Sequence, residues 1–114
     1  TEHRPEILGL WALQEKGNQC VEYYNFRKNK QLLIVSGEER IVAEYDYQEP
    51  ENLEQKHPLM TMKVLADNGQ TDCWGDRADQ SNSTQVTQIR WENPHQLQLC
   101  FDEKSCFTMH RVRP

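Results

Sequence analysis

Four cysteines are the residues in this 114-residue chain whose type and number most clearly predict chemistry. They are Cys20, Cys73, Cys100 and Cys106. An even number of cysteines in a small polar domain is typical of disulfide bonding in an oxidising compartment. No two of them form a Cys-x-x-Cys motif, and no histidine stands at zinc-ligand spacing from a cysteine pair. We therefore predict disulfides, no metal site and a secreted or periplasmic protein.

No other spacing of reactive side chains predicts catalysis. His57, His95 and His110 are isolated in the sequence, and none stands at a spacing that nominates a catalytic pair. The serines lack the Gly-x-Ser-x-Gly motif of many hydrolases. The sequence thus predicts a non-enzymatic protein without a cofactor.

The charge of the chain bears on its partners. With 13 basic and 18 acidic residues the formal net charge is −5, so a nucleic-acid ligand, which needs a basic surface, is not expected. Acidic residues gather at Asp46, Glu49, Glu51 and Glu54. This stretch is either a docking face for a cationic protein partner or a solvated linker. No apolar run approaches the roughly 20 residues of a membrane-spanning helix, so no transmembrane segment is predicted.

Short segments with β-strand character follow one another along the whole chain. The expected strands are residues 9–14, 20–27, 32–35, 41–48, 60–64, 71–74, 86–92, 97–101 and 107–109. Residues 41–48 alternate strictly between two faces, and Asn68-Gly69 is a strong hairpin signal that leads into 71–74. Eight or nine strands joined mostly by hairpins predict one all-β domain over residues 1–114, a small antiparallel up-and-down barrel. A two-sheet sandwich of the same strands is the alternative.

The last hairpin tests this prediction for internal consistency. If residues 102–104 form the turn, Leu99 faces Phe107 and Leu97 faces Met109 on the inner side. The same register places Cys100 opposite Cys106 on the outer side, at a distance that a disulfide can bridge. We therefore predict the pair Cys100–Cys106.

Elimination would then pair Cys20 with Cys73. A strict up-and-down count with 71–74 as the sixth strand puts these two residues at opposite ends of the barrel. Four cysteines permit three pairings, and the sequence alone leaves the choice open.

The segment Gly9-Leu10-Trp11 at the start of the first strand resembles the Gly-x-Trp motif of the lipocalin-like (calycin) barrels. The resemblance implies that Trp11 closes the barrel floor and that a basic residue of the last strand stacks on its ring. Arg111 and Arg113 stand where that residue is expected. The chain differs from lipocalins in its shorter length and in ending directly after its last strand. The resemblance favours a ligand-binding module of a secreted or periplasmic protein, for example the soluble part of a bacterial lipoprotein.

The interior of such a barrel would be lined by large apolar and aromatic side chains. These are Tyr45, Tyr47, Met60, Met62, Leu97, Leu99, Phe107 and Met109. They predict either a pocket for a small hydrophobic or amphipathic ligand or an ordinary packed core. Both interpretations stay open, because eight strands enclose an interior that side chains can just fill.

Overall fold

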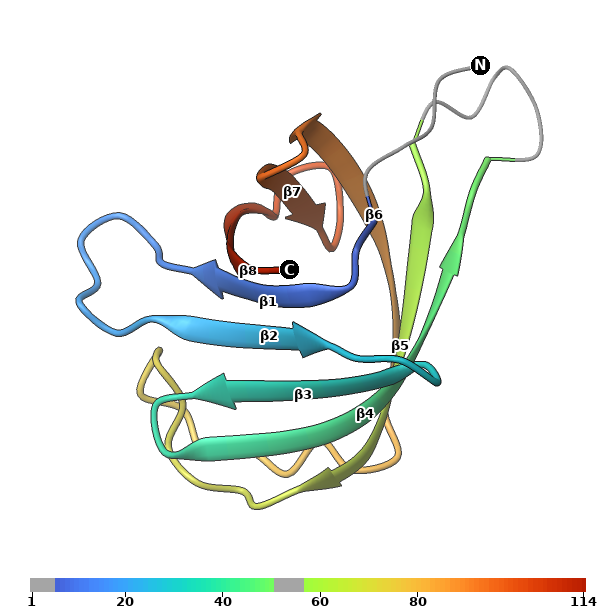
Figure 1. Ribbon diagram of the computed structural model, residues 1–114. Helices are drawn as coiled ribbons and strands as arrows, with labels where there is room; N and C mark the ends of the chain where they lie inside the picture. The colour runs from blue at the N-terminus through green and yellow to red at the C-terminus, as the bar shows by residue number, and fades with distance from the viewer. Residues whose placement is uncertain (1–5, 51–56) are drawn as a thin grey trace.

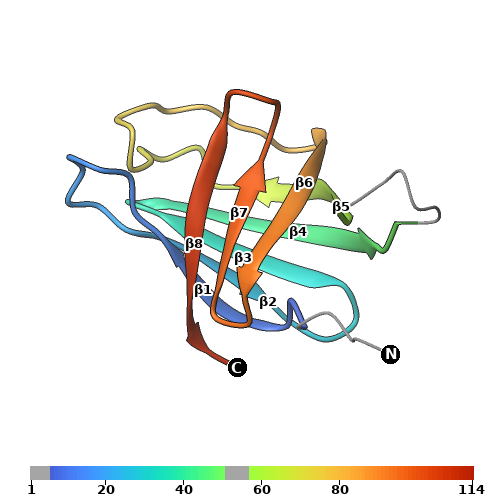
Figure 2. The same ribbon diagram turned by 90° about the horizontal axis from the view of Figure 1, so that it is seen from above.

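The computed structural model describes residues 6–50 and 57–114, which form eight strands. The strands are β1 (Gly9–Leu13), β2 (Glu22–Phe26), β3 (Gln31–Ser36), β4 (Glu39–Gln48), β5 (Leu59–Asp67), β6 (Thr84–Asn93), β7 (Gln96–Cys100) and β8 (Cys106–Arg113). Each strand pairs antiparallel with the next and β8 pairs with β1, which closes the sheet into a barrel (Figure 1). Figure 2 shows β6, β7 and β8 crossing β1 to β4 at a steep angle. The predicted up-and-down barrel is confirmed, and the sandwich alternative is wrong.

Alternation of side chains explains why these segments form one layer around a core. Along β4 the side chains of Glu39, Ile41, Ala43 and Tyr45 are buried, and the residues between them are exposed. A period of two is what a strand with one inner and one wet face requires. In residues 6–50 and 57–114 no helix has the length and the apolar character that spanning a membrane requires.

One end of the barrel is closed by Trp11. Its side chain is fully buried, its Nε1 donates a hydrogen bond to the Ile7 carbonyl (2.9 Å), and the guanidinium carbon of Arg111 lies 4.4 Å from the ring centroid. Arg111 also donates to the carbonyls of Leu8 (2.7 Å) and Pro94 (3.1 Å). The expected contact between a basic residue of the last strand and Trp11 is therefore present. Arg111 forms it, whereas Arg113 is exposed.

Gly9 lets β8 approach β1 beside this contact. Its φ of +131° lies in a region that L side chains rarely adopt, and a Cβ there would lie 2.5 Å from the Arg113 carbonyl oxygen. Only glycine fits without a shift of the backbone.

The last hairpin has the predicted register. Leu97 pairs with Met109, Leu99 with Phe107, and Cys100 with Cys106, and the last two residues form a disulfide. The backbone N–H of Phe101 donates to the carbonyl of Ser105 (2.9 Å), which closes the turn over the expected residues.

The prediction of a strand at 71–74 is wrong. Residues 68–83 form a loop, and β5 pairs instead with β6. Asn68 does not turn the chain back on β5, because its side chain accepts the backbone N–H of Arg40 (3.1 Å) and donates to the Glu38 carbonyl (3.0 Å). These bonds tie the chain to the turn between β3 and β4.

Because residues 71–74 are not a strand, the pairing of the second disulfide can also be explained. Cys20 lies just before β2, and Cys73 lies in the loop after β5. In an up-and-down barrel, the end at which β2 begins is also the end at which β5 finishes. Cys20 and Cys73 therefore meet, and they form a disulfide.

We expect Gly9→Ala to lower the free energy of unfolding by about 2 kcal/mol or more, since both the backbone angle and the contact with Arg113 oppose a side chain. Gly17→Ala is the matched control, because Gly17 has a φ of +88° but no neighbouring atom within 4 Å of the place that a Cβ would take. The control should cost only about 1 kcal/mol. Urea unfolding of both variants measures the difference, and equal losses would contradict the role given to Gly9.

Candidate functional site

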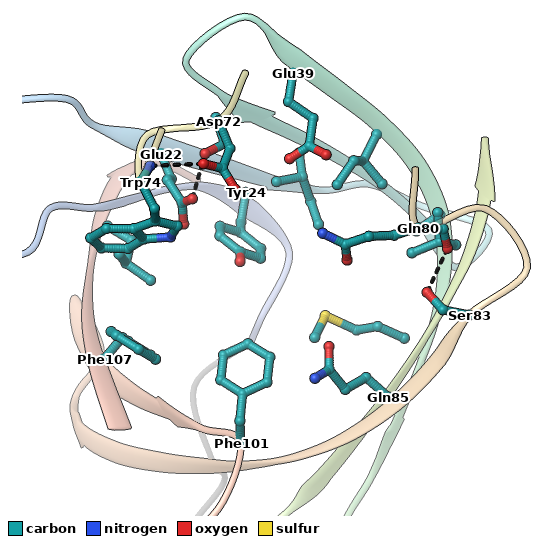
Figure 3. Close-up of a pocket in the computed structure, with 17 residues that line it drawn as sticks. Glu22, Tyr24, Glu39, Asp72, Trp74, Gln80, Ser83, Gln85, Phe101 and Phe107 are labelled. Carbon is teal, nitrogen blue, oxygen red and sulfur yellow. Dashed lines mark hydrogen bonds between the residues drawn. The ribbon is translucent and has the colours of Figure 1, made fainter. Parts of the chain in front are cut away.

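A cavity of about 260 Å³ opens at the end of the barrel opposite Trp11 (Figure 3). The apolar and aromatic part of its wall includes Tyr24, Ile34, Met62, Phe101 and Phe107, and Gln80, Ser83 and Gln85 add polar groups. The rings of Phe101 and Phe107 lie 5.9 Å apart, edge to face. The interior is thus hollow at this end, whereas Trp11 is fully buried in the packed core.

Carboxyl groups stand on one side of the mouth of this cavity. Figure 3 shows Glu22, Glu39 and Asp72 grouped there, on the side away from Phe101. They come from β2, from β4 and from the loop between β5 and β6. The inward alternation of each strand places Glu22 and Glu39 at the last inner position before solvent.

Glu22 is buried beside a serine. Only 8% of the residue is exposed, and its carboxylate accepts a hydrogen bond from the Ser36 hydroxyl. The Ser36 oxygen in turn accepts the backbone N–H of Cys73 (2.9 Å). Burial raises the pKa of Glu22, and the bond from Ser36 opposes this shift only in part.

Glu39 has the smallest exposed fraction among the carboxyls of the site, with 3% of the residue exposed. Burial, together with the neighbouring carboxyl of Asp67, raises its pKa to about 7. Asp72 and Glu22 add further negative charge in the same direction. Near pH 7 both the protonated and the ionised form of Glu39 are therefore populated.

The Tyr24 hydroxyl also points into the hollow (Figure 3). Tyr24 is buried, with 7% exposed, and its hydroxyl has no hydrogen-bond partner within the described part of the chain. Burial raises its pKa, and the charges of Glu22 and Glu39 add to the shift. A neutral hydroxyl that can donate and accept thus faces the cavity.

The loop 68–83 is fixed over the mouth of the cavity by covalent and polar contacts. Besides the disulfide Cys20–Cys73, the Asn18 side chain donates to the Cys73 carbonyl (2.9 Å), and Glu38 N–H donates to the Thr71 carbonyl (2.9 Å). Within the loop, Asp72 accepts the backbone N–H of Trp74 (2.8 Å). These contacts hold Asp72 and Trp74 at the rim.

Trp74 presents an aromatic surface at the same rim. The residue is 41% exposed, and its ring lies 6.3 Å from the ring of Phe107. Trp74, Phe107 and Phe101 thus form an aromatic side that adjoins the carboxyl side of the mouth (Figure 3).

The structure divides the eight predicted interior residues between the two ends of the barrel. Met62 and Phe107 line the cavity. The other six pack elsewhere in or against the core: Tyr45, Tyr47, Met60, Leu97, Leu99 and Met109. The two tyrosines among them use their hydroxyls near the closed end, where Tyr45 donates to the Arg27 carbonyl (2.9 Å) and Tyr47 accepts from Trp91 (3.0 Å).

Sequence reasoning missed the carboxyls, although a signal was present. Glu22 stands in phase with Tyr24 and Phe26, and Glu39 stands in phase with Ile41 and Ala43. A charged residue on the buried side of an alternating strand is uncommon and marks a site of interest. Asp72 and Trp74 gave no such signal, because the loop that carries them was expected to be a strand.

The structure describes only part of the other acidic stretch. Glu51 and Glu54 fall outside the described residues, and Asp46 forms an exposed ion pair with Lys30 (3.4 Å). Docking of a cationic protein there stays a prediction. No group of three or more His, Cys, Asp or Glu side chains in the described ranges is arranged to hold a metal ion.

We expect Glu39→Gln to change the pH dependence of stability. Because the folded state raises the pKa of Glu39 from 4.5 to about 7, it retains a proton that the unfolded state has lost between these values. The stability of the native protein therefore falls as pH rises from 4.5 through 7. The melting temperature of the variant, relative to the native protein, should rise by about 4 °C or more between pH 5 and pH 8.

Glu44→Gln is the control for that measurement, since Glu44 is exposed on the outer face of the same strand. Its effect on the melting temperature should not depend on pH over this range. If the difference in melting temperature between Glu39→Gln and the native protein also stayed constant from pH 5 to pH 8, the pKa of Glu39 would not be raised.

Comparison of the chain with protein-family models, with curated proteins and with solved structures finds no match. The site therefore has to be interpreted from its own geometry.

Proposed function

We propose that this barrel is a non-enzymatic binding module that holds a small amphipathic molecule in the cavity at its open end. The observation that carries the proposal is the cavity itself, about 260 Å³ of space in which apolar and aromatic side chains lie beside carboxyls grouped on one side of the mouth. Concave apolar sites with a few oriented polar groups are typical of small-molecule binding.

The cavity volume limits the size of the ligand. A cavity of roughly 150 Å³ lined by apolar side chains is enough to bind benzene. The space beside Met62, Phe101 and Phe107 would on this scale take a molecule of roughly ten non-hydrogen atoms.

Binding rather than catalysis is favoured by the hydrogen bonds of the two serine hydroxyls on the cavity. Ser36 donates to Glu22 and accepts from the Cys73 backbone, and Ser83 donates to the Gln80 carbonyl (2.5 Å). Each serine thus has a structural role in holding the rim together.

We further propose that the module is a lipocalin-like barrel from an extracytoplasmic protein. Support for the family comes from the closed eight-stranded topology and from the arrangement of Gly9, Trp11 and Arg111. Support for the compartment comes from the two disulfides, which persist where the environment is oxidising.

The neutral probe 2-phenylethanol tests the binding function, because it is amphipathic and of the size that the cavity takes. We expect saturable binding with a dissociation constant of about 1 mM or tighter, measured by calorimetry. Ala43→Leu, which adds three carbons to a side chain on the cavity wall, should weaken this binding at least tenfold.

Ala66→Leu is the matched control, since Ala66 is exposed on the outside of β5. It should leave the affinity for the probe unchanged, and circular dichroism should show that both variants keep the native fold. Absence of probe binding, or binding that Ala43→Leu does not weaken, would overturn the proposed function.

A further inference from the structure

The mouth of the cavity carries negative charge without a positive counterpart. Glu22, Glu39 and Asp72 line it, and none of the residues that line the cavity is lysine, arginine or histidine. An acidic surface of this kind is ordinary when it is exposed. Here two of the three carboxyls are more than nine-tenths buried, so water screens their charge poorly.

Among the residues that the structure describes, neither buried carboxyl has a cation to compensate it. In the described ranges no basic side chain forms an ion pair with Glu22 or Glu39. Arg40, the neighbour of Glu39 in sequence, points to the outer face and donates to the carbonyls of Gly37 (2.8 Å) and Glu39 (3.0 Å). A buried carboxylate without a counter-ion is costly, and that cost would fall if a cation entered the cavity.

The groups beside the carboxyls suit a cation that has an apolar body. The Tyr24 side chain is buried and its hydroxyl, which lacks a partner in the described chain, points into the hollow, so it can accept a hydrogen bond from a ligand N–H. The ring of Trp74 is open at the rim, and an indole face attracts a cation more strongly than any other side-chain ring. Below them, Phe101, Phe107 and Met62 offer apolar contact.

We propose that the ligand of this cavity is a small primary amine. Its ammonium group lies among the carboxylates of Glu22, Glu39 and Asp72 and under Trp74, and its apolar body extends along Phe101 and Phe107. This inference rests on the proposed binding function and names the chemical class of the ligand.

Other ligand classes fit the site less well. An anion would be repelled by three carboxylates, and a neutral molecule would leave the two buried ones uncompensated. A bare metal ion needs several oxygen ligands at short distances from one point, and the carboxyls of the described chain do not form such a group. An organic ammonium tolerates the wider spacing, because its charge can be shared among separate acceptors.

Two probes of the same shape test the proposal. 2-Phenylethylamine is protonated at pH 8, like a lysine side chain, whereas 2-phenylethanol is neutral and nearly isosteric with it. At pH 8 Glu39 is ionised in the empty protein. We expect calorimetry to give an affinity for the amine at least tenfold higher than for the alcohol. Raising the salt concentration should weaken only the binding of the amine.

Substitutions test whether the carboxyls cause the tighter binding of the amine. Glu39→Gln combined with Glu22→Gln should reduce the preference for the amine over the alcohol to less than threefold. Glu44→Gln, on the outer face of β4, should keep the full preference.

The outcomes separate this inference from the binding function on which it rests. If the alcohol binds and the amine binds no tighter, the amine proposal is overturned and the binding function stands. If a tenfold preference survives the double substitution, the carboxyls are not its source and the proposal fails. If neither probe binds, the binding function fails as well.

Discussion

The contact between Arg111 and Trp11 is the constraint on which the rest of the structure depends. It lies across the seam between the first and the last strand, whose backbone pairing closes the sheet into a barrel. Gly9 lets the two strands approach, and the guanidinium also binds backbone carbonyls on both sides of the closure. The large side chains around Trp11 then fill that end of the interior. The cavity lies at the other end, and an interior of eight strands has room for one small ligand.

The open end is organised by a different set of contacts. The disulfide Cys20–Cys73 and the bonds from Asn18 and to Thr71 fold the loop 68–83 over the rim. Two carboxyls are buried beneath this loop without a basic partner among the described residues. Burial of this kind opposes folding, and natural proteins tolerate it mainly where function requires it. We therefore regard the rim, rather than the packed core, as the part of the molecule that a ligand recognises.

The sequence predicted those features that depend on local alternation. The register of the last hairpin followed from agreement between the inner residues Leu97 and Leu99 and the outer pair Cys100 and Cys106, two independent constraints on one turn. The Asn68-Gly69 signal failed because long-range bonds from Asn68 to the turn between β3 and β4 outweigh a local turn preference. The wrong prediction of a strand at 71–74 also made the pairing of Cys20 with Cys73 look unfavourable. For the same reason Asp72 and Trp74 were not recognised as rim residues. Glu22 and Glu39 alternate in phase with buried neighbours, so the sequence could have predicted that both are buried. It could not have predicted that they lie close together.

The division of the barrel into a packed end and an accessible hollow end can be measured through its three methionines. Met62 lines the cavity, whereas Met60 and Met109 are fully buried outside it. In protein labelled with ¹³C at the methionine methyl groups, titration with 2-phenylethylamine should shift the Met62 signal saturably and leave the signals of Met60 and Met109 in place. Equal shifts of all three signals, or no shift of Met62 at saturating probe, would contradict the account.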